Sequence, residues 1–104
     1  MVDSQQRVLF VITIDTEIDK SHDWSVSSRE SFQSVVQGIP DVLTPLFTKY
    51  RARPTYLLSA EVMENDDCVG VLGDLEGSEL GTHLHGDVVE PQRRLRTLKA
   101  ERIE

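Results

Sequence analysis

Apolar and polar residues alternate along the chain in a pattern typical of strands that are followed by helices. Val8–Ile14 (VLFVITI) is a continuous apolar run, rich in β-branched residues, that stops at Asp15. Such a run favours a strand covered on both faces, as in a parallel sheet flanked by helices. Two shorter runs, Thr55–Ser59 (TYLLS) and Glu79–Leu84 (ELGTHL), predict a second and a third strand.

Segments with helical spacing of apolar residues lie between and after these strands. In residues 39–50 the apolar positions recur at three- and four-residue intervals, which predicts an amphipathic helix. Pro40 fits its first turn, whereas Pro45 predicts a kink or a later start because proline lacks the backbone donor. A weaker helix is predicted over 62–75 and a further one over 91–104.

The predicted order is therefore β-α-β-α-β-α, which indicates the α/β class with a parallel sheet and right-handed crossovers. No linker or repeat divides the chain, so we expect a single domain over residues 1–104. Because three strands form a small sheet, we expect either a truncated domain, the first part of a larger α/β unit, or a small domain that needs a partner. A homo-oligomer could supply that partner by covering the exposed sheet edge.

Composition narrows the classes of partner. The formal net charge is −7, and the basic residues gather in residues 91–104, so the acidic body disfavours nucleic acid and anionic membranes. The first segment has neither the basic start of a signal peptide nor the apolar length of a membrane span, so we expect a cytoplasmic protein. Cys68 is the single cysteine, which excludes an internal disulfide and a thiolate cluster. Its apolar helical surroundings predict a buried, unreactive thiol.

Candidate chemistry gathers where the predicted strands end, since ligands of parallel sheets bind beyond the carboxyl ends of the strands. Asp15 and Glu17 follow the first strand, and His83 and His85 end the third. Residues two apart on a strand share a face, so each pair is expected to point one way. Two carboxylates facing two imidazoles suit a divalent transition metal with a water. On spacing alone, this site and ordinary polar strand ends explain the four residues equally well.

The long polar loop after the first strand carries two further candidates. His22 is expected to be a loop residue that could fold over the rim of the site. Trp24 suits either stacking on a sugar ring or a half-buried anchor for the loop. Loops of this length inside a compact domain are commonly functional or disordered.

Three segments together resemble a known family. TIDTE (13–17), PTYLLS (54–59) and ELGTHLH (79–85) are similar to the amino-terminal portion of the polysaccharide deacetylase (NodB homology) family, in its divergent WalW-like branch. The resemblance implies a deformed (β/α) barrel of which this chain would be the first part. It also implies a hydrolase that removes acetyl groups from N-acetylated carbohydrates or related small amides with a bound divalent metal, usually zinc.

The resemblance assigns roles to individual residues. Asp15 matches the family's catalytic base, and Thr16 stands where the family has a metal-binding aspartate, which makes Glu17 the substitute ligand. His83 matches the first histidine of the second motif. The second histidine would fall on Asp87, so either Asp87 or His85 is the remaining ligand, and we favour His85.

The family's later motifs, which supply an arginine and a final histidine acid, have no counterpart in this chain. Two functional hypotheses follow. The first is a zinc-dependent deacetylase, or an amino-terminal fragment of one. The second is a catalytically incomplete α/β module that binds metal or oligomerises.

Overall fold

The computed structural model describes residues 6–24 and 30–83 and contains a three-stranded parallel sheet with helices. The strands are β1 (Thr13–Thr16), β2 (Thr55–Leu58) and β3 (Glu79–Thr82), ordered β1-β2-β3 across the sheet. Thr13 pairs with Thr55, and Thr55 pairs with Glu79. The predicted α/β character and parallel sheet are confirmed.

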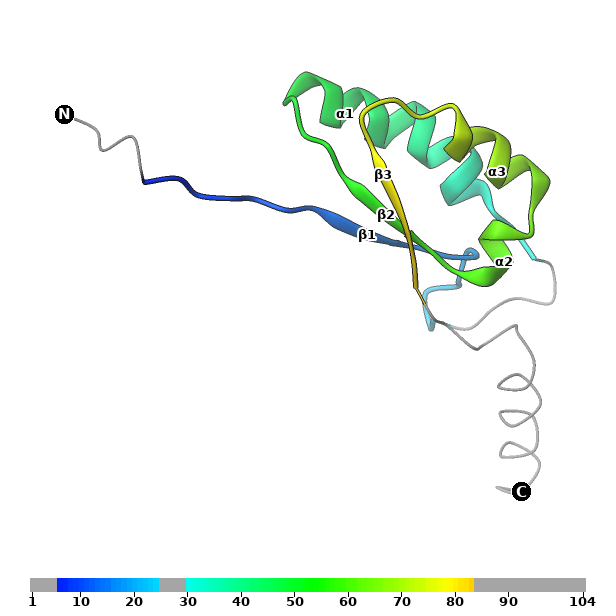
Figure 1. The fold of residues 1–104 in the computed structure, drawn as a ribbon. Helices are drawn as coiled ribbons and strands as arrows, with labels where there is room; N and C mark the ends of the chain where they lie inside the picture. Colours follow the sequence, from blue (N-terminus) through cyan, green and yellow to red (C-terminus); the bar gives the residue numbers. More distant parts are fainter. Residues whose placement is uncertain (1–5, 25–29, 84–104) are drawn as a thin grey trace.

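The helices lie between the strands in sequence and to one side of the sheet in space (Figure 1). They are the π-helical segment η1 (Ser34–Leu43), which continues into α1 (Thr44–Lys49), followed after β2 by α2 (Ala60–Met63) and α3 (Asp66–Gly73). When strands are added in one direction, right-handed crossovers place every helix on the same face. The opposite face of the sheet is left without a helix from the described residues.

The core fills the space between that covered face and the helices. Its buried members come from η1, β2 and the two later helices: Val35, Ile39, Tyr56, Leu58, Val62, Cys68 and Leu72. On β2, Tyr56 and Leu58 point to this side, so by alternation Leu57 points to the open face. On that face Gly81 of β3 leaves the space that Leu57 uses, because a Cβ at Gly81 would lie 2.9 Å from Leu57 Cδ2.

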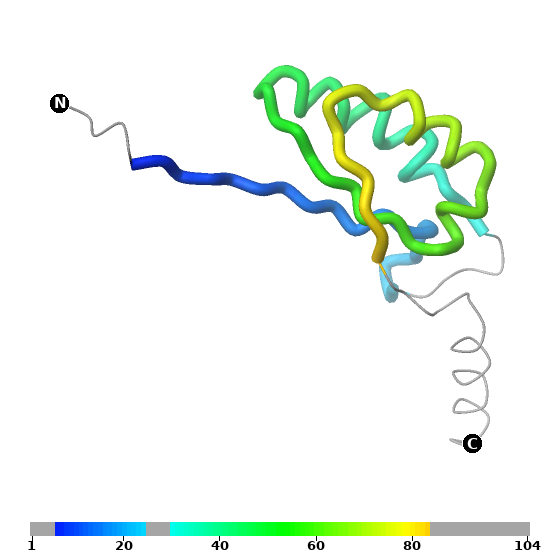
Figure 2. The backbone as a smooth tube through the Cα atoms, viewed as in Figure 1, coloured from blue at the N-terminus to red at the C-terminus, as the bar shows by residue number. Residues whose placement is uncertain are grey.

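The first strand differs from the prediction. Only its last part pairs with β2, and β1 spans Thr13–Thr16 in place of Val8–Ile14. The reason is register: β2 starts at Thr55, which pairs with Thr13, so earlier residues have no β2 residue beside them. In Figure 2 the chain before β1 runs away from the sheet as an extended tube. The expectation that Val8–Ile14 is covered on both faces is therefore wrong for the described part of the chain.

The helices also differ in their bounds. The predicted helix over 39–50 begins earlier, at Ser34, so Pro40 lies inside it, where the missing N–H coincides with the wider π-helical turn. Pro45 lies in the first turn of α1, in line with the predicted later start. The predicted helix over 62–75 is two helices, because Asn65 is extended and its side chain caps α3 by accepting a bond from the Cys68 N–H (3.0 Å).

Three further expectations concern the last predicted helix, a membrane span and Cys68. The predicted helix over 91–104 lies outside the described residues. Within those residues, no helix has both the length and the apolar character needed to span a bilayer. Cys68 is fully buried, as predicted, and burial together with the nearby Asp67 and Asp19 carboxylates raises the pKa of its thiol to about 11.

Candidate metal centre

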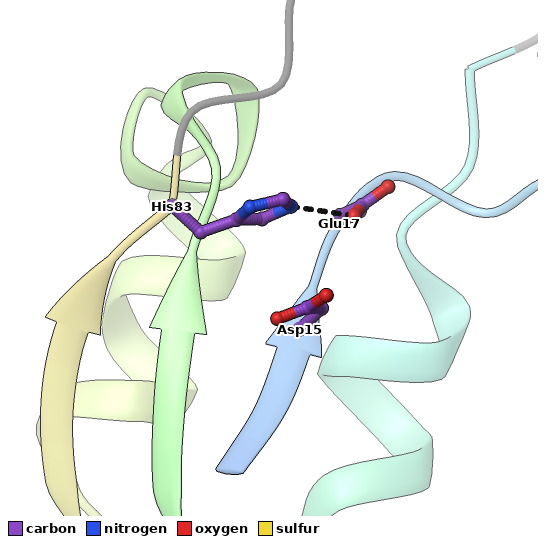
Figure 3. A group of neighbouring side chains, drawn as sticks. All are labelled: Asp15, Glu17 and His83. Carbon is purple, nitrogen blue, oxygen red and sulfur yellow. Dashed lines mark hydrogen bonds and ion pairs between the residues drawn. The ribbon is translucent and has the colours of Figure 1, made fainter.

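Three side chains with metal-binding atoms converge at the carboxyl end of the sheet, on its open face. Asp15 comes from β1, Glu17 lies just past it, and His83 directly follows β3 (Figure 3). One carboxylate oxygen from each acid and one ring nitrogen of His83 all lie within 4.8 Å of one another. Donors around one tetrahedral zinc lie roughly 3.3 Å apart, given bonds of about 2.1 Å, so small side-chain movements would bring these three onto one ion.

Glu17 and His83 are in direct contact. Nε2 of His83 lies 2.6 Å from Oε1 of Glu17, and the two side chains are 19% and 17% exposed. Because a carboxylate can only accept, the contact places a proton on Nε2 of His83. A metal ion bound at Nε2 would displace that proton, and the neutral ring would then carry its proton on Nδ1.

Lys20 contacts the oxygen of Glu17 that does not face His83. Its Nζ lies 2.7 Å from Oε2 of Glu17, so each oxygen of this carboxylate faces a donor. The same ammonium group lies 6.0 Å from the centre of the Trp24 ring. The ammonium group of Lys20 therefore competes with a metal ion for the carboxylate of Glu17.

The strand ends are fixed relative to one another through β2. Ser59, which is fully buried, donates to the Thr16 carbonyl from both its N–H (3.0 Å) and its Oγ (3.2 Å). The N–H of His83 donates to the Leu58 carbonyl at 2.9 Å. Backbone hydrogen bonds therefore hold both β1 and β3 to the carboxyl end of β2. On β1 the bond is at Thr16, immediately before Glu17, and after β3 it is at His83.

Asp19 fastens the loop that follows Glu17. Its carboxylate accepts bonds from the Ser31 hydroxyl (2.7 Å), the Gln33 N–H (2.9 Å), the Ser34 N–H (3.1 Å) and the Ser34 hydroxyl. Burial alone would raise the pKa of Asp19, but these hydrogen bonds outweigh it and hold the pKa below its ordinary value. Gln33 and Ser34 begin the helix, so Asp19 acts as its N-terminal cap from twelve or more positions upstream.

Glu61 is a second acid near this loop. Its Oε1 lies 3.5 Å from the N–H of Ile18, while its Oε2 is buried and has no hydrogen-bond partner within the described part of the chain. Glu61 lies in the first turn of α2, just after β2, and thus borders Ile18, the residue that follows Glu17. Glu61 is neither one of the predicted metal ligands nor the predicted base.

A cleft of about 910 Å³ opens beside β1, between the strand, its following loop and η1. Asp15 and Glu17 line one part of it, and Ile14, Ile39 and Leu43 form an apolar part. His22 and Trp24 lie on the loop side of the same cleft. Trp24 is 78% exposed and has a φ of 65°, which aromatic residues rarely adopt, so of its two predicted roles the half-buried anchor is not observed.

The structure thus brings together three of the predicted site residues. Asp15, predicted as a base, is exposed and lies within the same donor group as Glu17 and His83. His85 and its alternative, Asp87, lie outside the described residues. Sequence reasoning missed Asp19 and Lys20, because the bonds from Asp19 to the helix start and the contact of Lys20 with Glu17 both depend on the path of the loop.

Comparison with family models, with curated proteins and with solved structures found no match to this chain. The resemblance to polysaccharide deacetylases therefore remains a prediction from its three sequence segments.

Proposed function

We propose that this chain carries a divalent-metal centre, most readily zinc, of a cytoplasmic hydrolase that cleaves the amide of an N-acetylated carbohydrate. The observation that carries the proposal is the convergence of Asp15, Glu17 and His83. Glu17 and His83 lie 66 positions apart in the chain, yet their side chains are in contact. The reaction and the substrate come from the resemblance of TIDTE and ELGTHLH to polysaccharide deacetylases.

The donor set fits a transition metal. Mg²⁺ and Ca²⁺ prefer oxygen donors alone, whereas an imidazole beside carboxylates suits zinc and its neighbours. Glu17 and His83, with His85 added from the resemblance, would supply three protein donors and leave a position for water or substrate, as catalytic zinc sites do. The Glu17 and His83 side chains are partly buried, which favours a bound ion over a solvated one while keeping the open face of the sheet accessible.

Each residue then has a chemical task. A bound zinc ion would polarise the amide carbonyl and lower the pKa of a water molecule. Glu17 and His83 would hold the ion, and Asp15, the most exposed of the three, would accept the proton of the attacking water and return it to the leaving amine nitrogen. Lys20 stays beside Glu17 and balances part of its charge. We place His85 as a further ligand on the strength of the resemblance alone.

One observation favours a second candidate function. Both oxygens of Glu17 already face cationic or donor groups, His83 on one side and Lys20 on the other. A cluster of this kind can also tie strand ends together without turnover. The alternative is therefore an α/β module that binds metal or only stabilises its own sheet.

Zinc titration of the metal-free chain by calorimetry tests the centre. We expect His83→Ala to weaken zinc binding by at least about tenfold, since it removes a ligand. His22→Ala is the matched control, because His22 lines the same cleft but does not belong to the donor group. Equal losses in both variants, or no zinc binding by the unaltered chain, would contradict the metal centre.

Turnover separates the two candidates. Acetate release from an N-acetylglucosamine oligomer should require added zinc, and Asp15→Asn should abolish it. If Asp15 is a base, this variant should still bind zinc. Zinc binding without acetate release would favour the module that lacks turnover.

A further inference from the structure

The segment before β1 is the most exposed apolar part of the described chain. Val8, Leu9, Phe10 and Val11 are 94%, 89%, 84% and 74% exposed. They follow one another directly and lead into β1 without a turn (Figures 1 and 2). A long, uncharged strand edge of this kind is a ready template for pairing with another strand.

The backbone of β1 offers one such edge. Thr55 donates to the carbonyl of Ile12, and Ser59 donates to that of Thr16, so the even-numbered residues of β1 face β2. In a parallel strand the N–H and C=O of one residue point to the same neighbour, so those of Thr13 and Asp15 point away from β2. No described strand lies on that side, because β1 is at the edge of the order β1-β2-β3.

An apolar surface lies beside this free edge of β1 and could receive the side chains of an added strand. If the extended conformation continues, Val8 and Phe10 share the face of Ile14, which packs against the core. The apolar part of the cleft, formed by Ile14, Ile39 and Leu43, lies on this side of the free edge. An incoming strand beside β1 would therefore place one row of side chains against apolar walls.

We propose that a second copy of this chain covers this edge. The two copies pair antiparallel about a two-fold axis at Ile12, so that the segment 8–11 of each lies along β1 of the other. In this register Phe10 lies opposite the partner's Ile14, and Val11 opposite the partner's Thr13. The odd-numbered residues, whose polar groups face outward on β1, exchange the hydrogen bonds. The result is a six-stranded sheet with both sets of helices on one face.

The self-complementary register is what selects a second copy. A closed two-fold interface needs one surface that holds both the inserted and the receiving element, and here the apolar segment and the apolar cleft wall are consecutive on one strand. Four side chains of this size offer on the order of 400 Å² of apolar surface, or about 800 Å² for two copies. Backbone pairing and cleft walls bring this to about the 1,000 Å² that a specific interface needs.

The charge of the chain predicts how the stability of the dimer depends on salt. Residues 8–14 contain no charged side chain, whereas each whole chain carries a formal charge of −7. The apolar contact is thus opposed by repulsion between the two bodies, which salt screens. The dimer should become tighter as sodium chloride is raised, opposite to the behaviour of a complex formed between opposite charges.

Sedimentation equilibrium of the full chain tests the proposal with a matched pair of variants. Phe10→Lys should weaken the dimer by about tenfold or more, because it places a charge on the covered face, opposite the partner's Ile14. Val69→Lys is the control, since Val69 is an exposed apolar residue that lies on α3, away from the edge. A monomeric unaltered chain, or equal dimer strength in both variants, would overturn the proposal. The β1 edge would then pair with a strand that does not come from a second copy of this chain.

Cysteine cross-linking tests the register. Ile12→Cys would place two thiols face to face across the axis, where a disulfide can form under mild oxidation. The native Cys68 is fully buried and should not compete. Met63→Cys, on α2, is the control. A covalent dimer from Ile12→Cys alone supports the pairing, whereas cross-linking that is no better than in the control would overturn it.

Discussion

The two ends of the first apolar run have opposite surroundings. At its carboxyl end, residues 13–16 pair with β2 and lead into Glu17, whose side chain contacts both His83 and Lys20. At its amino end, residues 8–11 are all apolar, and yet they are 74–94% exposed. Apolar character alone therefore does not decide burial; the position of the neighbouring strand does.

The difference also separates function from assembly. Polar side chains cluster where backbone hydrogen bonds fix the strand ends, which is what a site with defined geometry needs. The exposed end has no such side chains and offers backbone and apolar area, which suit pairing with another strand. Variants at the two ends should therefore affect different measurements.

The largest contrast is expected between two aromatic residues. Tyr56→Ala removes a side chain that is 1% exposed at the centre of the core, and we expect it to lower the free energy of unfolding by about 3–5 kcal/mol. Phe10→Ala removes one that is 84% exposed and should change it by less than about 0.5 kcal/mol in the monomer. Urea unfolding followed by circular dichroism, at a dilution that prevents association, measures both. Comparable losses would mean that Phe10 is already covered within one chain.

Asp19 should give the next largest effect. Asp19→Ala removes the cap at the start of η1 and leaves the Ser34 and Gln33 N–H groups without it, at a cost of about 1–2 kcal/mol. The loop that carries Glu17 should loosen with it, so zinc affinity should fall as well. Asp41→Ala, an exposed acid on the same helix, is the control for loss of charge. If the two variants unfold at the same urea concentration, the cap contributes nothing.

The bonds of Asp19 illustrate what the sequence could not reveal. Its partners Ser31 and Ser34 lie 12 and 15 positions away, beyond any local capping pattern, so the sequence predicts a helix start at Ile39 in place of Ser34. The beginning of β1 was misplaced for a related reason. An apolar run can indicate a strand, but its paired length depends on where β2 starts, and that is a non-local fact. The break at Asn65 needed a single side-chain bond that competes with the helix.

The candidate site was more predictable because it follows from topology. Alternation puts Asp15 and Glu17 on one face, and parallel strands bring their carboxyl ends to one edge, which places His83 near them. Those two rules were enough to select three residues that the structure brings within 4.8 Å. They could not supply Lys20, whose contact depends on how the loop turns after Glu17.

The smallest effect should appear at alkaline pH and concerns Cys68. Burial, with Asp67 and Asp19, raises the pKa of this thiol from 9.0 to about 11, so the folded state holds its proton longer than the unfolded state does. The resulting stabilisation is complete below pH 9, and it is lost as the pH rises through about 11. Between pH 9 and pH 10 we expect a loss of about 1 kcal/mol from this group. In Cys68→Ala this part of the decline should be absent.

A chain with both Cys68→Ala and Val11→Cys, whose thiol would be exposed, is the control. It should behave like Cys68→Ala, because an exposed thiol titrates alike in the folded and unfolded states. An equal alkaline decline in all three chains would mean that the Cys68 thiol is not shielded by the core, and the contrast between a covered core and an uncovered strand edge would then fail at this position.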